Sequence, residues 1–140
     1  MSTITHIFID FDGTLHTADV RTRDLFCWLP LLVKILEPYT AVRIIVSSDW
    51  RTRCSDEQLI QILGPLGSRF AGITETYGSD RAQEIRDDVR ARKITRWLAL
   101  DDHETVQIAA KSNPRFVWCP PDQGISCPVV QAKLKGLLAS

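Results

Sequence analysis

Short apolar runs alternate with helical patterns along the chain. The apolar runs are rich in β-branched and aromatic residues and stop at polar clusters, as expected for strands buried on both faces of a sheet. Four strands are predicted in this way, over residues 4–9, 41–46, 97–100 and 115–118.

The segments between these runs carry apolar residues at helical spacing. A first helix is predicted to begin near Pro30, because proline fits a first helical turn and disrupts an interior. Ser55, followed three residues later by Gln58, is typical of a capping box and predicts a helix that ends near Gly64. Two further helices are predicted over residues 80–93 and 128–138, and the interval between Gly64 and residue 80 is interpreted as irregular.

Strands that alternate with helices predict an α/β fold, a doubly wound parallel sheet with helices on both faces. The length of 140 residues fits a single domain over residues 1–140. In open parallel sheets, ligands bind outside the carboxyl ends of the strands. Asp10, Ser47 and the pair Asp101 and Asp102 follow three predicted strands. These side chains are therefore expected to converge on one edge of the sheet.

The composition is that of an ordinary globular protein, with 44% hydrophobic and 24% charged residues. Seventeen Lys and Arg balance seventeen Asp and Glu, so no global field attracts the chain to nucleic acid or to an acidic membrane. Arginine supplies twelve of the cations, which leaves room for a locally basic groove. No transmembrane run or signal peptide is recognisable, and the four cysteines lack metal-ligand spacing. These features predict a cytoplasmic protein with free thiols and no membrane association.

Asp10 and Asp12 lie two residues apart at the end of the first predicted strand, and Gly13 allows the chain to turn beside them. Paired carboxylates repel one another and are usually stabilised by a cation, and their oxygens suit Mg²⁺. A plain Asp-Gly turn explains Gly13 but not an acid directly after an apolar run. The pair is therefore a candidate for catalysis and metal binding.

Residues 7–15, Ile-Phe-Ile-Asp-Phe-Asp-Gly-Thr-Leu, resemble the first motif of the haloacid dehalogenase-like (HAD) superfamily of phosphatases and phosphotransferases. The other motifs follow in the expected order: Ser47 after the second strand, a basic residue that opens a helix, and the acidic pair after a later strand. Finer features resemble a capless bacterial and phage branch that is related to the phosphatase-like domains of RNA-repair proteins. These features lie in residues 29–32, 46–51, 72–74, 81–85, 100–102 and 124–126.

The resemblance implies a phosphomonoester hydrolase that works through an aspartyl-phosphate intermediate. Asp10 would be the nucleophile and Asp12 the general acid and base. Mg²⁺ would be held by Asp10, the backbone carbonyl of Asp12 and Asp101. Ser47 and the basic residue would stabilise the transferring phosphoryl oxygens. Asp102 either supports the metal waters and the basic residue or caps the helix that follows.

Arg81 and Lys93 are the two candidates for the basic residue. Arg81 opens the predicted helix and Lys93 closes it. A helix antiparallel to the next strand places its first residue at the catalytic edge, so Arg81 is predicted, although lysine is commoner in the superfamily. Arginine keeps the charge and can grip phosphate with two N–H groups.

Several residues after the first and second strands are candidates for binding the substrate or completing a phosphate nest: Phe11, Gly13, Thr14, Ser48, Trp50 and Arg51. Trp50 could stack on a base or cover the site, and Arg51 could contact a distal phosphate. The alternative is that both simply pack near the next helix. His16 either touches the substrate or is an ordinary loop histidine.

The intervals from Asp12 to Ser47 and from Ser47 to Arg81 are too short to hold a cap domain of the usual size. An uncapped site can admit a nucleic-acid end, a nucleotide or a phosphoprotein as well as a small ester. A receiver domain is excluded because the acidic pair comes late in the chain. A catalytically weak phosphate- or nucleic-acid-binding module is the remaining alternative, against which the intact Asp10 and Asp12 argue. The sequence gives no indication of oligomeric state.

Overall fold

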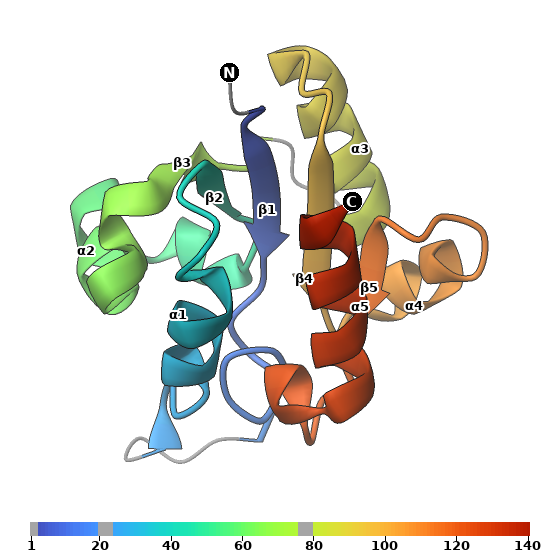
Figure 1. Cartoon of the computed structure of the whole chain (residues 1–140). Coiled ribbons are helices and arrows are strands. Elements are labelled where there is room, and N and C mark those ends of the chain that lie inside the picture. The colour runs from blue at the N-terminus through green and yellow to red at the C-terminus, as the bar shows by residue number, and fades with distance from the viewer. Residues whose placement is uncertain (1–2, 20–23, 76–79) are drawn as a thin grey trace.

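Five parallel strands form one sheet at the centre of the computed structural model, which describes residues 3–19, 24–75 and 80–140 (Figure 1). Their order is β3-β2-β1-β4-β5, and every neighbouring pair runs parallel. The predicted parallel α/β sheet is confirmed. The strands are β1 (Thr5–Ile9), β2 (Val42–Val46), β3 (Phe70–Ile73), β4 (Trp97–Asp101) and β5 (Phe116–Trp118).

The helices begin where local sequence signals predict them. Pro30 lies in the first turn of α1, and Ser55 and Gln58 form the capping box of α2. The α-helices are α1 (Leu29–Leu36), α2 (Asp56–Ile62), α3 (Arg81–Arg92), α4 (Glu104–Ala110) and α5 (Pro128–Ala139). Shorter 3-10 turns are η2 (Asp49–Thr52), η3 (Gly64–Arg69) and η4 (Gly124–Ser126).

The strand β3 is absent from the sequence-based prediction, which assigned that interval to irregular structure. It is an edge strand of four residues, none of them fully buried, and Gly72 interrupts its side-chain pattern. A half-buried edge strand carries no continuous apolar run, so its pairing with β2 was not visible from local pattern alone.

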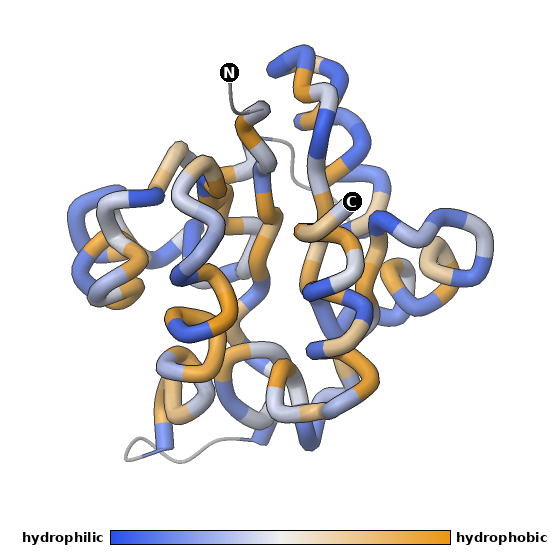
Figure 2. The backbone as a smooth tube through the Cα atoms, in the orientation of Figure 1, coloured by the Kyte–Doolittle hydropathy of each residue, from blue (hydrophilic) through white to orange (hydrophobic). Residues whose placement is uncertain are grey.

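Helices cover both faces of the sheet, as predicted. Ile7 and Ile9 of β1 point to the core beneath α1, α2 and α5, whereas Phe8 points to the smaller core beneath α3 and α4. This follows from the alternation of side chains along a strand. Hydrophobic residues concentrate in the central strands and α1, while α3 is mostly hydrophilic (Figure 2).

Arginines tie the outer elements to the sheet through backbone carbonyls. Arg69 donates to the carbonyl oxygen of Tyr39 at 2.6 Å and Arg92 to that of Ile73 at 2.7 Å. Arg96 donates to Leu138 at 3.2 Å, at the end of α5. These arginines therefore serve the fold rather than a basic groove. All four cysteines are free thiols, as predicted.

The direction in which strands are added reverses between β1 and β4, and the region outside the carboxyl ends of these two strands is here called the crevice. The chain adds β2 and β3 on one side of β1 and then returns to add β4 on the other side. Connections diverge at such a switch point, and ligands bind there in open α/β sheets. Within the described part of the chain, no helix combines the length and apolar character needed to cross a membrane.

Candidate active site

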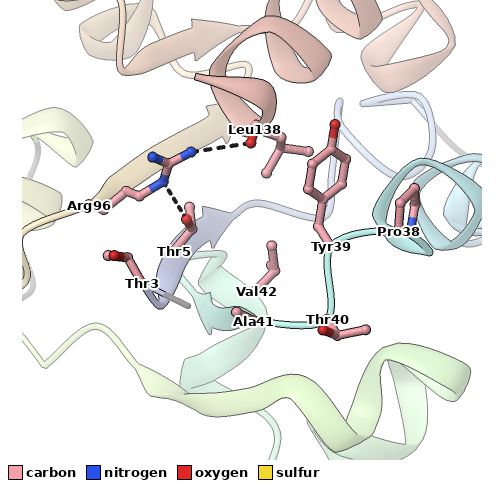
Figure 3. A pocket seen from close by; sticks show the side chains of 9 residues that line it. All are labelled: Thr3, Thr5, Pro38, Tyr39, Thr40, Ala41, Val42, Arg96 and Leu138. Carbon is pink, nitrogen blue, oxygen red and sulfur yellow. Dashed lines mark hydrogen bonds between the residues drawn. The ribbon is translucent and has the colours of Figure 1, made fainter. Parts of the chain in front are cut away.

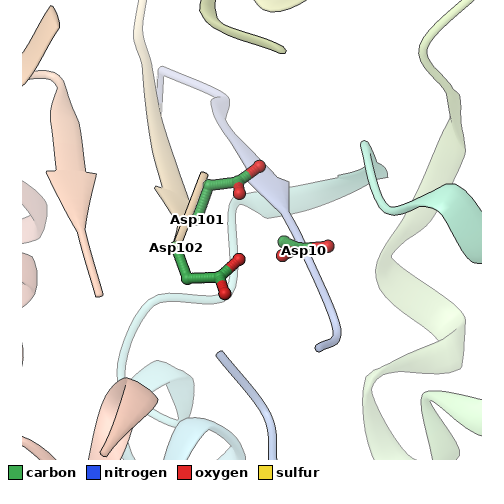
Figure 4. A group of neighbouring side chains, drawn as sticks. All are labelled: Asp10, Asp101 and Asp102. Carbon is green, nitrogen blue, oxygen red and sulfur yellow. The ribbon is translucent and has the colours of Figure 1, made fainter. Parts of the chain in front are cut away.

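Three carboxylates meet at this crevice. Asp10 follows β1, Asp101 ends β4 and Asp102 comes next, and one oxygen of each lies within 4.8 Å of the others (Figure 4). Asp10 and Asp101 are buried, and Asp102 is half-buried. The parallel sheet thus brings together acids that are about ninety positions apart in the sequence.

The surroundings of these acids disfavour their charges. Burial, and then the neighbouring Asp101 carboxylate, raise the pKa of Asp10 well above its ordinary value. Burial likewise raises the pKa of Asp101, although Arg81 opposes this effect. A cluster of oxygen donors that repel one another fits a hard divalent cation such as Mg²⁺. The residues present are therefore suited to the metal that the resemblance implies.

Gly13 makes room for this cluster. Its φ of +77° lies in the left-handed region that favours glycine, and a Cβ atom built there would overlap the Asp102 carboxylate. Any side chain at this position would displace Asp102 from the group of acids. The glycine predicted to allow a turn is thus also required by the close approach of β4.

Arg81 supplies the positive charge beside the acids. It is the first residue of α3, a helix whose start is fixed by the Asp80 carboxylate accepting from the Gln83 N–H. The Arg81 guanidinium lies 2.9 Å from Asp101 Oδ2 and 3.5 Å from Asp10 Oδ1. Burial alone would lower the pKa of Arg81, but the carboxylates of Asp101 and Asp10 outweigh it and raise that pKa further. Arg81 therefore stays charged.

Lys93 lies at the other end of the same helix. It caps α3 in the left-handed conformation and is exposed. A twelve-residue helix is roughly 18 Å long, so this side chain is remote from the acids that Arg81 contacts. The structure places Arg81, and not Lys93, beside the buried carboxylates of Asp10 and Asp101.

Arg81 also contacts two acids that the sequence analysis did not single out. Its Nη2 lies 3.0 Å from Asp49 Oδ1, and its Nε lies 3.4 Å from Glu84 Oε2. Glu84 is buried one turn along α3, whereas the Asp49 side chain is 79% exposed. In the sequence, Asp49 is indicated only by its place in the motif after the second strand. Glu84 is indicated only by its i, i+3 spacing from Arg81.

Ser47 presents a buried hydroxyl at the same edge. It follows β2, and its N–H donates to the carbonyl oxygen of Ile9 at 3.0 Å. Its side chain is fully buried, and its Oγ has no hydrogen-bond partner among the described residues. An unmet buried polar group costs about 1–3 kcal/mol, so this hydroxyl is suited to an oxygen of a bound ligand.

Thr74 is a second buried hydroxyl of this kind; it lies in residues 72–74, which carry the family resemblance, but the sequence analysis gave it no role. Thr74 directly follows β3, its N–H donates to the carbonyl oxygen of Val46, and its Oγ1 lacks a partner within the described ranges. The position of Thr74 at this edge could only have been predicted by first recognising β3, because Thr74 lies beside β2 through the pairing of β3 with β2.

Arg51 does not lie where a distal phosphate could reach it. Its side chain is 1% exposed, and its Nη1 donates to the carbonyl oxygens of Ser47 at 2.6 Å and Ser48 at 3.1 Å. Its Nη2 lies 3.4 Å from Glu84 Oε2. Of the two alternatives for Arg51, these contacts favour packing over a phosphate contact, because the residue holds the loop after β2 in place.

The remaining candidates line the site through their backbones or shape it through packing. Phe11 is fully buried and packs edge-on against Trp50, with ring centroids 5.8 Å apart. The carbonyl oxygen of Thr14 accepts from the Ile125 N–H, and Ser48 Oγ accepts from the Trp50 N–H to start η2. The suggested backbone nest for phosphate remains a prediction.

Asp12 is separate from the acidic cluster. Its side chain is 45% exposed, and its two oxygens face His16 and Trp50. Only its backbone carbonyl was predicted to bind the metal, and that part remains a prediction. The Asp12 carboxylate is thus partly exposed to solvent while each of its oxygens has a hydrogen-bond partner.

A cavity at the opposite edge of the sheet has a different character. Its volume is about 340 Å³, and Figure 3 shows it near the start of β1, between Tyr39 and Arg96. Arg96 is held there by the hydroxyl of Thr5 and the carbonyl oxygen of Leu138. Among the described residues that line this cavity there is no carboxylate, in contrast to the cluster of Asp10, Asp101 and Asp102 at the other edge.

Comparison with protein families finds one match that covers most of the chain. The model described as "HAD domain in Swiss Army Knife RNA repair proteins" matches residues 6–130. The matched range includes β2 to β5, all of β1 except Thr5, and the three acids Asp10, Asp101 and Asp102. Comparison with curated proteins and with solved structures found no match.

Proposed function

Because the chain belongs to the family of HAD domains in Swiss Army Knife RNA repair proteins, we propose that it is a Mg²⁺-dependent phosphomonoesterase. Its proposed substrate is a terminal phosphate of a nucleic acid, removed through an aspartyl-phosphate intermediate. The observation that carries the proposal is the group formed by Asp10, the Asp101–Asp102 pair and Arg81, with the unmet hydroxyl of Ser47 beside it.

Asp10 is the proposed nucleophile. A carboxylate oxygen of Asp10 attacks phosphorus, and the bond between phosphorus and the leaving oxygen breaks as Asp12 gives that oxygen a proton. Water then attacks phosphorus, Asp12 takes a proton from the water, and the bond to Asp10 breaks to release inorganic phosphate. Asp12 therefore ends the cycle in the protonation state in which it began.

Arg81 and Ser47 stabilise the phosphoryl oxygens during both transfers. The Arg81 guanidinium is already held beside the acids and the Ser47 hydroxyl is buried without a partner among the described residues, so they need little rearrangement when charge develops. Asp10, Asp101 and the backbone carbonyl of Asp12 would hold Mg²⁺, with Asp102 in support. Bound there, the ion would neutralise phosphoryl oxygens that the acidic cluster otherwise repels.

The openness of the crevice favours a macromolecular end as the substrate. Among the described residues, the link from β1 to β2 contains one α-helix, α1, and the link from β2 to α3 contains α2, two 3-10 turns and β3, so these residues form no cap over the site. The seventeen cations are balanced by seventeen acids, so no net charge attracts the chain to a duplex. Recognition of a single terminal phosphate needs only the local charges of the crevice.

A phosphatase panel tests this function directly. The full chain is incubated with Mg²⁺ and RNA or DNA oligonucleotides that carry a 5′- or a 3′-phosphate, and released phosphate is measured. Mononucleotides and phosphopeptides are compared at equal concentration, and Asp10→Asn is the inactive control. Preference for an oligonucleotide end supports the proposal. Preference for a phosphopeptide would contradict the substrate class, and binding without turnover would indicate a phosphate-binding domain.

A further inference from the structure

We infer that His16 and Trp50 are positioning residues that hold the Asp12 carboxylate in place for proton transfer. The inference rests on the proposed function, because it assigns a task to residues around its acid and base. Two donors approach Asp12 from different elements: His16 Nε2 lies 2.7 Å from Oδ1, and Trp50 Nε1 donates to Oδ2 at 3.2 Å.

The surroundings of His16 decide which of its nitrogens carries the proton. The backbone N–H of Phe26 donates to His16 Nδ1 at 3.0 Å, so that nitrogen presents its lone pair. In the neutral ring the proton is then on Nε2, which donates to Asp12. The side chain of His16 is fully buried, so it does not reach the substrate.

An aromatic cage keeps this arrangement rigid. The ring of His16 packs edge-on against Phe26 with centroids 4.9 Å apart, and Trp50 packs against Phe26 at 5.2 Å and Phe11 at 5.8 Å. Phe26 has a φ of +58°, in the left-handed region that bulky residues avoid. Phe26 donates its backbone N–H to His16, and its unfavourable φ indicates that the surrounding packing imposes this local geometry.

The two donors also keep Asp12 out of the metal-binding group. One hydrogen bond on each oxygen restrains both torsions of the side chain and directs it away from Asp10, Asp101 and Asp102. A carboxylate free to rotate could join those acids on a cation and would then be unavailable for proton transfer. His16 and Trp50 therefore separate the acid and base from the nucleophile two residues earlier.

Three variants test the roles of the two donors. His16→Leu removes the ring donor but keeps an apolar side chain, His16→Gln restores an amide N–H near the position of Nε2, and Trp50→Phe removes only the indole N–H. Trp97→Phe is the matched control, because Trp97 packs against Phe8 and Phe116 by the other face of the sheet. Melting temperatures of all four variants report any loss of folding.

The readout compares two esters. An alkyl phosphate needs a proton on its leaving oxygen, whereas p-nitrophenyl phosphate has a good leaving group and needs this help far less. His16→Leu is expected to lower kcat/KM about 100-fold for the alkyl ester and less than about 3-fold for the aryl ester. Trp50→Phe is expected to lower the alkyl value about 10-fold, and His16→Gln to recover most of the loss. Equal losses on both esters would overturn the inference.

A double variant separates positioning from a general structural effect. In an Asp12→Asn background, His16→Leu should change kcat/KM for the alkyl ester less than about 2-fold, because there is no acid left to position. A further large loss in that background would show that His16 acts otherwise and would overturn the inference.

A measurement without turnover distinguishes this inference from the proposed function. The ¹⁵N NMR signals of His16 should show a proton on Nε2 and none on Nδ1 in the wild-type protein, with Nε2 shifting in Asp12→Ala. If the wild type hydrolyses neither ester, the proposed function fails, and the positioning role fails with it even where the NMR signals confirm the contact. If it hydrolyses both and the tautomer is reversed, only the positioning role fails.

Discussion

Asp10 and Asp12 are separated by a single residue, yet they lie in contrasting surroundings. Asp10 is buried among two other acids and Arg81, where burial and the Asp101 carboxylate raise its pKa. Asp12 is 45% exposed and accepts one hydrogen bond on each oxygen within an aromatic cage. The two carboxylates have the same chemistry and close positions in the sequence, so their surroundings alone separate their tasks.

The contrast shows how the chain after β1 directs the side chains of Asp10 and Asp12 to different places. Asp10 extends β1 toward β4, whereas Gly13 turns the chain and the Thr14 N–H donates to the carbonyl oxygen of Phe11. Asp12 is thereby carried past the rim of the sheet toward His16 and the loop after β2. The proposed nucleophile, Asp10, therefore lies among the buried acids, and the proposed acid and base, Asp12, lies at the more exposed position.

The largest effect is expected at Asp10. Asp10→Asn should lower kcat at least about 1000-fold, because the amide cannot form the phosphoenzyme. Single-turnover assays with a ³²P-labelled oligonucleotide should show labelled wild-type protein and no label on the variant. Substantial activity in Asp10→Asn would contradict the different roles proposed for Asp10 and Asp12, since Asp10 would then not be the nucleophile.

Removal of the metal should have a comparable effect. EDTA is expected to abolish phosphate release, and excess Mg²⁺ to restore it, because the three acids otherwise repel the phosphoryl group. Activity that persists in chelator would contradict the metal site. A companion binding measurement with Mg²⁺ alone should show weaker binding in Asp101→Asn than in Asp12→Asn, since only the former removes a predicted side-chain ligand.

The basic residue is expected to give an intermediate effect. Arg81→Ala removes a charge-assisted contact and should cost on the order of 2–4 kcal/mol of transition-state stabilisation, or about 30- to 1000-fold in kcat/KM. Arg81→Lys should recover much of the loss. Lys93→Ala, the control at the far end of α3, should change kcat/KM less than about 3-fold. A larger loss of kcat/KM in Lys93→Ala than in Arg81→Ala would assign the role of the basic residue to Lys93.

The smallest effect concerns stability in metal-free buffer. The pKa of Asp10 is raised in the folded state, so the wild type loses stability as pH rises above the ordinary carboxyl range toward that raised value. Asp10→Asn carries no such charge and should melt a few degrees higher, roughly 2–6 °C, at pH 8 but not at pH 3.5. Thermal melts at both pH values check this, and a lower melting temperature at pH 8 would contradict it.

The sequence predicted most of the framework of the site. Four strands, the helix starts at Pro30 and Ser55, and the convergence of Asp10 with Asp101 followed from local pattern and the rule for parallel sheets. The placement of Arg81 at the start of α3 followed from helix polarity. The prediction failed at β3, whose half-buried residues take their strand conformation from pairing with β2.

The sequence could not decide which partners a side chain has. Two alternatives stayed open for Arg51, a phosphate contact or packing, and the structure shows it buried against the carbonyl oxygens of its own loop. Many of the arginines that left room for a basic groove are likewise used within the fold, as Arg69 and Arg96 show. An arginine looks the same in the sequence whether it meets a ligand or a carbonyl group.

The sequence by itself determined the candidate catalytic groups and the strand ends that they follow. It could do so because apolar periodicity and turn signals act over a few neighbouring residues. Only the tertiary structure decided which partners each charged group contacts and how deeply the group is buried. Trp50 reaches Asp12 across 38 positions of sequence, and Asp101 reaches Arg81 across 20. Burial and hydrogen bonding depend on distances of a few ångströms, and those distances are set by the packing of the whole sheet and its helices.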